Sequence, residues 1–268
     1  MSVHVGCCGL PVSSRRYFSS LRTVELDAPF YSLPRIETAR RWRQEAPEGF
    51  EFSLKAWQLI THPSASPTYR RLGAGARKSY RLEHCGFFRD SEEVARAWEG
   101  VLDTARALAA RFILFQTPSS FRPGPDRLRD FYRFFKNARR ERFRFAWEPR
   151  GGWAPSLVAR VCSDLGLVHA FDPLALPHCA PPAAGGGALY LRLYRNDSPG
   201  SYTDAELGRL RESLRGKGTV FAYFGGRAMW NDARRFLRLL EGPAAKGPPS
   251  SKGGRFPLPE GATRRGGL

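Results

Sequence analysis

Short runs of apolar and β-branched residues recur along the chain and alternate with stretches of helical periodicity as far as residue 241. Eight of these runs predict strands, at 3–7, 24–28, 50–55, 112–116, 143–148, 168–172, 189–194 and 220–224. The stretches between them predict helices, at 36–45, 91–110, 126–140, 155–165, 203–215 and 228–240. This alternation favours a single-domain α/β fold over 1–241, a TIM (β/α)8 barrel, with an open doubly wound sheet as the alternative.

Two connections and the C-terminal segment depart from this regular alternation. The connection at 56–90, between the third strand and the next long helix, is long and basic, which is typical of a lid over a site or of a surface excursion. The connection at 173–187 is rich in Pro and Gly and predicts little helix. The segment 242–268 is rich in Gly, Pro and Ser and predicts a disordered basic tail.

The alternation of side chains along each strand assigns several charged residues to the inside of the barrel. In 50–55 and 143–148 the large apolar residues face the helices, so Glu51 and Arg144 face the axis and are predicted to pair. The same rule places seven polar residues at the C-terminal mouth: Glu25, Asp27, Lys55, Gln116, Glu148, Asp172 and Arg192. Buried charges need partners or a ligand. Because TIM-barrel sites lie at this end, a ligand site is favoured over an internal salt-bridge network.

Composition changes the picture mainly through charge. The net charge of +18 and the pI near 10.5 favour anionic partners, including nucleic acid. No stretch resembles a signal peptide or reaches membrane-spanning length, so a cytoplasmic protein without a membrane partner is expected. The five cysteines are scattered, and their spacing predicts neither a disulfide framework nor a structural zinc site.

Several short motifs follow one another in a characteristic order. They are Gly6 with Gly9, Glu25 before Phe30-Tyr31-x-Leu-Pro34, Lys55 with Thr61-His62, Phe115-Gln116-x-Pro118, Trp147-Glu148-x-Arg150 and Tyr190-x-Arg192. Together these motifs resemble the domain-of-unknown-function 72 family, also called YecE-like, from Gly6 to about Phe236. The resemblance implies a TIM barrel and carries no established activity.

The resemblance also implies which polar positions are typical of the family. They map onto Glu25, Tyr31, Lys55, Thr61, His62, Gln116, Glu148, Arg150 and Arg192. Two segments depart from the family pattern, Tyr194-Arg195 after the seventh strand and Phe224-Gly225-Gly226 at the end of the eighth.

These residues predict a site for a phosphate-containing or nucleic-acid ligand. Lys55, Arg150, Arg192 and Arg195 supply positive charge, and Gly225 with Gly226 offers backbone N–H groups. The catalytic candidates are Glu25, Lys55, Glu148 and His62, and an enzyme built from them is expected to hydrolyse phosphate esters. The remaining ligand-binding candidates are Tyr31, Thr61, Gln116, Asp172 and Tyr194.

A metal-assisted phosphodiesterase is a special case of this hypothesis. A divalent ion held by Glu25, Glu148 and Asp172, with His62 or His169, is compatible with the composition of the mouth. No His-x-His or His-Glu-x-x-His spacing supports it, so the identity of any cofactor is left open.

Two other functions are kept as alternatives. A non-enzymatic nucleic-acid binder would use the tail and the basic stretch 126–144, whose aromatic residues at helical spacing favour core packing over base stacking. A glycoside hydrolase-like enzyme would use carboxylate pairs, with Trp57, Trp147 and Trp153 as platforms for sugars. The second idea rests mainly on fold analogy, and the positive charge favours an anionic ligand instead.

Overall fold

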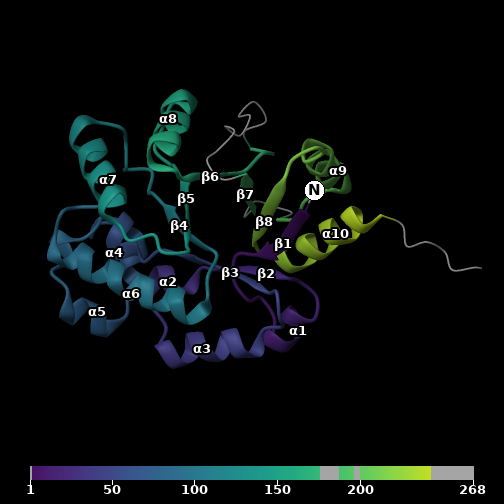
Figure 1. The fold of residues 1–268 in the computed structure, drawn as a ribbon, viewed down its shortest axis with the longest axis horizontal. Helices are drawn as coiled ribbons and strands as arrows, with labels where there is room; N and C mark the ends of the chain where they lie inside the picture. The colour runs from purple at the N-terminus through teal and green to yellow at the C-terminus, as the bar shows by residue number, and fades with distance from the viewer. Residues whose placement is uncertain (1, 176–186, 196–199, 243–268) are drawn as a thin grey trace, which may run out of the picture.

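Eight parallel strands form the centre of the molecule in a computed structural model that describes residues 2–175, 187–195 and 200–242. The strands are β1 (Ser2–Cys7), β2 (Thr23–Leu26), β3 (Glu51–Lys55), β4 (Phe112–Gln116), β5 (Arg144–Glu148), β6 (Val168–Phe171), β7 (Ala188–Arg195) and β8 (Thr219–Gly226). They are ordered β1-β8-β7-β6-β5-β4-β3-β2, and helices surround them (Figure 1). The predicted TIM barrel is therefore confirmed, and each predicted strand is present with its ends moved by two residues at most.

The barrel closes between β1 and β2 through a seam with little strand pairing. A single bridge joins Cys8 to Glu25. Below it the Tyr17 hydroxyl accepts a hydrogen bond from the Cys7 amide at 2.7 Å and donates one to the Thr23 carbonyl at 2.9 Å. This phenol thus takes the place of a direct backbone bond, because backbone groups buried at a seam need a partner.

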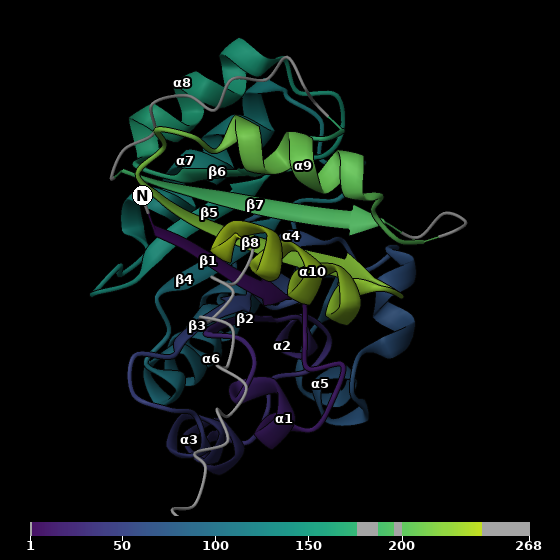
Figure 2. The same ribbon diagram turned by 90° about the vertical axis from the view of Figure 1, so that its right-hand side faces the viewer.

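The helices cover the outside of the barrel. The longer ones are α3 (Ile36–Glu45), α6 (Glu92–Leu108), α7 (Pro125–Asn137), α8 (Pro155–Leu165), α9 (Asp204–Ser213) and α10 (Met229–Glu241). The predicted starts are confirmed: Ser91 accepts the Val94 amide, and Thr203 forms a capping box with Glu206. Figure 2 shows α9 and α10 outside β7, β8 and β1.

The connection at 56–90 is packed against the body of the protein. It contains the short elements α4 (Gln58–Thr61), η1 (Pro67–Arg71), α5 (Ala74–Ser79) and η2 (Leu82–His84), while α1 (Ser14–Phe18) and α2 (Ala28–Tyr31) follow β1 and β2. Leu59, Ile60 and Phe88 are buried, and the Tyr69 hydroxyl donates to the His62 carbonyl at 2.9 Å. The connection is therefore not a loose surface excursion. It packs as a wall beside the barrel mouth.

Strand alternation separates an inner core from an outer core, as predicted. The inner core contains Phe112, Leu114, Ala146, Tyr190, Phe221 and Tyr223, which form a cluster distinct from the apolar residues under the helices. The Tyr223 hydroxyl lies 2.8 Å from the Ser53 hydroxyl and 2.9 Å from that of Thr23. Buried polar groups of the barrel interior are thus hydrogen-bonded to one another.

The predicted ion pair between Glu51 and Arg144 is wrong. Glu51 pairs with Arg111 at 2.7 Å, and the Arg144 guanidinium lies 5.1 Å from the ring centre of Phe112. Arg111 lies one residue before β4 and reaches the lower rim from outside the strand pattern. The alternation rule applies only within strands, so it could not predict Arg111 as the partner of Glu51.

Some expectations fall outside the described residues. Most of the Pro- and Gly-rich connection at 173–187 and nearly all of the segment 242–268 belong to this group. In the part of the chain that is described, no helix has the length and apolar character needed to cross a membrane.

Candidate functional site

A buried ion pair lies at the centre of the barrel mouth. Glu25 on β2 is fully buried, and Arg192 on β7 donates to it through Nε, at 3.1 and 3.0 Å, and through Nη2, at 2.8 Å. The Tyr190 hydroxyl donates to the same carboxylate at 2.7 Å. Burial raises the pKa of Glu25, although Arg192 opposes this change. The pair spans the barrel and holds strands that are far apart in sequence.

The Arg192 guanidinium contacts three further groups. Its Nη1 donates to Glu148 Oε2, and its Nη2 lies 3.5 Å from Asp27 Oδ1 and 3.7 Å from Cys8 Sγ. Arg192 is only 3% exposed, so its own charge is compensated by these carboxylates rather than by water. Arg192 is therefore the hub of the network.

Glu148 at the end of β5 is held as an anion. Gln116 donates to its Oε2 at 2.8 Å, and Arg150 donates to its Oε1 at 3.2 and 3.1 Å. Burial acts to raise the pKa of Glu148, but Arg192 and Arg150 together lower it to about 2. At neutral pH this carboxylate accepts hydrogen bonds or protons and has no proton to donate.

Lys55 ends β3 inside the same mouth. It is 7% exposed, and its Nζ lies 3.9 Å from the ring centre of Phe30. Burial lowers the pKa of Lys55, and the largest opposing effect comes from the charge of Asp27. A cation–π contact stabilises the ammonium less than a carboxylate would.

His62 also packs against Phe30. Its ring centre is 4.9 Å from that of Phe30, and its Nδ1 lies 2.8 Å from the hydroxyl of the buried Thr61. Burial, followed by the charges of Lys55 and Arg150, lowers the pKa of His62 to about 3. His62 is therefore neutral at physiological pH and lies in a positive electrostatic field.

Acidification provides a test of this environment. Because the folded pKa of His62 is near 3 and the unfolded value is near 6.5, the unfolded chain binds more protons between these limits. The contribution of His62 therefore lowers the free energy of unfolding by up to about 2 kcal/mol from pH 7 to pH 5. We expect His62→Gln to remove this part of the pH dependence, as measured by urea unfolding at both pH values. Equal pH slopes for wild type and variant would contradict the burial of His62.

Two cavities open at the mouth and meet at Arg150. The first, of about 400 Å³, is bounded by residues of β5, β6 and β7 that include Glu148, His169, Asp172 and Arg192. The second, of about 640 Å³, is bounded by the wall at 56–90 and by the loop after β4, and its lining includes His62, Ser66, Thr68, Ser119 and Ser120. Arg150 lines both, and its side chain is half-exposed. Arg150 is thus accessible to a ligand in either cavity.

Several of the predicted site residues lie apart from the central network. Asp172 accepts the Leu174 and Ala175 amides at 2.8 and 3.3 Å and only lines the first cavity. The Tyr31 ring packs against Arg71, whose guanidinium lies 3.5 Å from its centre. Tyr194 and Gly225 are neighbours on β7 and β8, and a Cβ at Gly225 would lie 2.1 Å from the Tyr194 ring.

The Gly225-Gly226 pair is part of a paired strand. It forms the last two residues of β8, in register with Tyr194 and Arg195, and Gly226 has a φ of +95°. Arg195 makes a two-point ion pair with Glu206, at 3.1 and 2.7 Å. Gly225 therefore serves close packing with Tyr194, and the structure gives no separate indication of a phosphate nest at this pair.

Potential metal ligands come together in one place within the described ranges. Cys8, Glu25 and Asp27 have ligand atoms within 4.8 Å of one another. The Arg192 guanidinium contacts all three, and a divalent cation there would meet this fixed positive charge. The set predicted from sequence, with Glu148, Asp172 and a histidine, does not form such a group among these residues.

Sequence reasoning missed Cys8 and Phe30 as parts of the site. Cys8 shares the inward face with Gly6 just beyond β1, so extending the alternation rule by one residue would have found it. Phe30 lies in the short helix α2, where the rule for strands does not apply.

Some basic residues of the outer surface near α7 are paired with acidic groups. On α7 and just after it, Arg129 pairs with Asp126 at 2.8 Å, and Arg139 pairs with Glu99. Phe131 and Phe135 are buried, which confirms that these aromatic residues belong to the core. The pairing reduces the positive charge that this helix offers to a nucleic acid.

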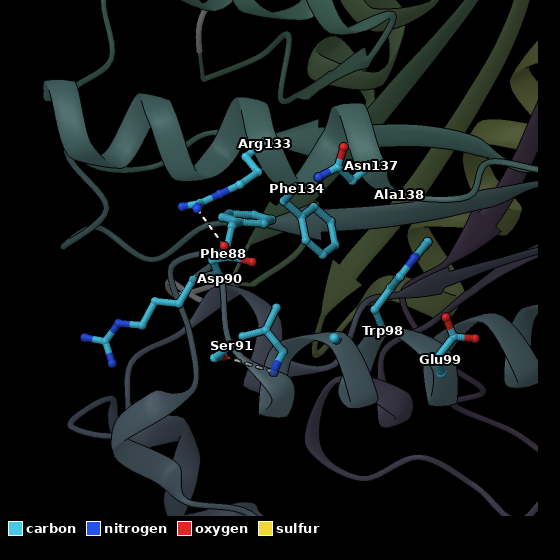
Figure 3. Close-up of a pocket in the computed structure, with 12 residues that line it drawn as sticks. Phe88, Asp90, Ser91, Trp98, Glu99, Arg133, Phe134, Asn137 and Ala138 are labelled. Carbon is cyan, nitrogen blue, oxygen red and sulfur yellow. Dashed lines mark hydrogen bonds and ion pairs between the residues drawn. The ribbon is translucent and has the colours of Figure 1, made fainter.

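A separate cavity of about 240 Å³ lies between α6 and α7 (Figure 3). Phe88, Trp98 and Phe134 surround it, while Arg133 on its rim binds Asp90 at 2.7 Å. It lacks the group of buried, mutually interacting charges found at the barrel mouth. The mouth is therefore the stronger candidate site.

Comparisons with known proteins agree with the fold. A family model described as "Protein of unknown function DUF72" matches residues 13–253, and no protein with a curated description matches the chain. A DUF72 family protein from Enterococcus faecalis is similar in structure, with a TM-score of 0.63 and 15% identity over 90% of this chain and 98% of that chain. A DUF72 family protein from Thermotoga maritima gives 0.62 and 14% over 90% and 100%. Endonuclease IV from Thermus thermophilus gives 0.53 and 13% over 90% and 97%, which shows a shared fold.

Proposed function

The chain belongs to the DUF72 family of proteins of unknown function, and we propose that it binds a phosphate-containing ligand at the C-terminal mouth of its barrel. The observation that carries this proposal is that Arg150 and His62 line one cavity and that Lys55 packs against Phe30 beside His62. An anion placed among these three side chains is attracted by both cations. It also lets His62 accept a proton, since a nearby negative charge raises the pKa of an imidazole.

The lining of the second cavity supports the same ligand class. Ser66, Thr68, Ser119 and Ser120 bring hydroxyl groups to the cavity that Arg150 and His62 also line. Hydroxyls donate single hydrogen bonds to phosphate oxygens, and a guanidinium binds two of them at once. Arg150 is half-exposed and can exchange part of its contact with Glu148 for a contact with the ligand.

If the ligand is hydrolysed, the two glutamates have different roles. Glu148 stays ionised because its pKa is about 2, and it would act as a general base. Both oxygens of Glu25 are engaged by Arg192, and Tyr190 also donates to that carboxylate, so Glu25 would position Arg192 rather than donate a proton. The proton donor would then have to come from another group or from water.

Nucleic acid would be the polymeric form of such a ligand. The net charge of +18 favours it, whereas the ion pairs along α7 favour the mouth over the outer helix as the place of contact. The similarity in fold to endonuclease IV agrees with this form of the proposal. A shared fold does not assign the reaction.

We expect Arg150→Gln to weaken the binding of pyrophosphate and adenosine monophosphate about tenfold or more, because a charge-assisted hydrogen bond contributes about 1.5–3 kcal/mol. Isothermal titration calorimetry measures the affinity. Arg160→Gln is the matched control, since Arg160 is 79% exposed and lies on α8. Short single-stranded DNA and RNA, titrated at two salt concentrations, test the polymeric form.

The titration of His62 gives a second readout of the same proposal. Bound phosphate should raise the pKa of His62 from about 3, which is observed as a change of its ring resonances in NMR spectra. The proposal is overturned if none of these ligands binds, or if Arg150→Gln and Arg160→Gln bind them equally well.

A further inference from the structure

Lys55 is unusual in this chain because it is a lysine. Only six of the 43 basic residues are lysines, and the others are arginines. Of the four lysines in the described ranges, Lys78, Lys136 and Lys217 are exposed and Lys55 is buried. An arginine remains charged at any physiological pH, whereas a buried lysine can lose its proton and act as a nucleophile. The buried position at the mouth thus carries the one basic side chain type that is capable of amine chemistry.

The surroundings of Lys55 make the loss of its proton easier than for an exposed lysine. Its Nζ lies over the ring of Phe30, and among the described residues no carboxylate oxygen lies within 4.0 Å of it. Burial lowers its pKa, and this effect, to which Arg192 adds, exceeds the opposing effect of Asp27 and the other carboxylates. A lysine in such an environment is an activated nucleophile.

We propose that Lys55 forms a Schiff base with the carbonyl group of a phosphorylated aldehyde or ketone held at the barrel mouth. This inference rests on the proposed function, since the phosphate would occupy the positive field around Arg150 and His62. His62 and Arg150 line the same cavity, and Lys55 and His62 both pack against Phe30, so the amine adjoins the phosphate site. A small sugar phosphate carries both groups that such a site recognises.

The reaction is balanced without an added oxidant or reductant. The neutral amine of Lys55 adds its lone pair to the carbonyl carbon, a C–N bond forms, and the electron pair of the C=O double bond moves to oxygen. A proton moves from nitrogen to that oxygen and gives a carbinolamine. A second proton reaches the hydroxyl, water leaves, and an iminium ion remains.

The carboxylates whose charges act on Lys55 lie beyond hydrogen-bond reach of its Nζ, so they would move these protons through a water molecule. Among the negative charges, Asp27 has the largest effect on the pKa of Lys55. Its Oδ1 is buried without a hydrogen-bond partner. Glu148 has the second largest effect of this kind, and it is ionised at neutral pH. A carboxylate can take the proton from nitrogen and return it to the leaving hydroxyl.

Reductive trapping tests the proposal directly. The protein is incubated with glyceraldehyde 3-phosphate and sodium cyanoborohydride, which delivers a hydride to the iminium carbon and makes the bond permanent. We expect the intact mass to rise by that of the aldehyde less one oxygen atom. Peptide mapping should place the adduct on Lys55 at a level at least about tenfold above that on Lys78, because a lower pKa leaves more free amine at pH 7.

The Lys55→Arg variant is the matched control, since it keeps the charge and cannot form an imine. It should lose the Lys55 adduct and retain the weak labelling of Lys78. Within the wild-type protein, Lys78 serves as an internal control that does not depend on the folding of any variant. Equal labelling of Lys55 and Lys78, or absence of the Lys55 adduct, overturns the inference.

A second aldehyde separates this inference from the proposed function. Glyceraldehyde carries the same carbonyl and no phosphate. If it labels Lys55 as well as glyceraldehyde 3-phosphate does, the amine chemistry stands and phosphate binding is contradicted. If pyrophosphate binds with the expected dependence on Arg150 while neither aldehyde labels Lys55, the phosphate site stands and the Schiff base is excluded.

Discussion

Replacing Arg192 by methionine is expected to lower the free energy of unfolding by about 3–5 kcal/mol, because the change leaves buried carboxylates without their countercharge. Glu25 is fully buried, and Glu148 also loses a donor. Urea unfolding at pH 7 measures the effect. The expected loss is large because no water reaches Glu25 to replace the guanidinium.

The double variant Glu25→Gln/Arg192→Met shows where this loss arises. It removes the charge of Glu25 together with its partner, so it should recover part of the stability that the single variant loses. Arg160→Met, at an exposed position on α8, should change stability by less than about 0.5 kcal/mol. A loss of under about 1 kcal/mol for Arg192→Met would contradict the burial of the network.

Gly6→Ala is expected to destabilise the protein by about 3 kcal/mol, because a Cβ at this position has no room. It would lie 2.3 Å from the Thr23 carbonyl oxygen, which is a backbone atom and cannot rotate away. The same carbonyl accepts the Tyr17 hydroxyl at the seam between β1 and β2. Thermal and urea unfolding measure the change.

Gly208→Ala is the control for this prediction. Gly208 lies within α9, and a Cβ there meets no atom within 4 Å. Alanine should therefore stabilise the helix by about 0.5–1 kcal/mol. If Gly6→Ala and Gly208→Ala behave alike, the close approach of the two strands at the seam is wrong.

The central network and the proposed ligand site share side chains but differ in function. Glu25 and Arg192 are buried and bonded to each other, so they close the barrel whether or not a ligand is present. Lys55 and Arg150 sit at the edge of this network, one over an aromatic ring and the other half-exposed. The expected internal salt-bridge network is thus found at Glu25 and Arg192, whereas the ligand site at Lys55 and Arg150 is a proposal.

The alternation of apolar and polar residues was sufficient to predict the eight strands and the inward face of most charged residues. Side chains on a strand point to opposite faces in turn, and this rule depends only on local backbone geometry. Glu25, Lys55, Gln116, Glu148 and Arg192 were therefore placed at the mouth from sequence alone. Helix starts such as Ser91 and Thr203 were predicted for the same reason, since a cap bonds to a backbone amide a few residues away.

Only the tertiary structure decided which of these charges meet. Arg192 bonds to Glu25 across 167 residues, and Glu51 bonds to Arg111 instead of Arg144. It also decided the pKa of His62, which depends on burial and on two cations from other parts of the chain. Such pairings follow from strand register and from the closure of the barrel, and pKa values follow from the distances that result. The sequence pattern predicts the face on which each side chain lies. Contacts across the barrel form only when the barrel closes, so the sequence pattern does not predict them.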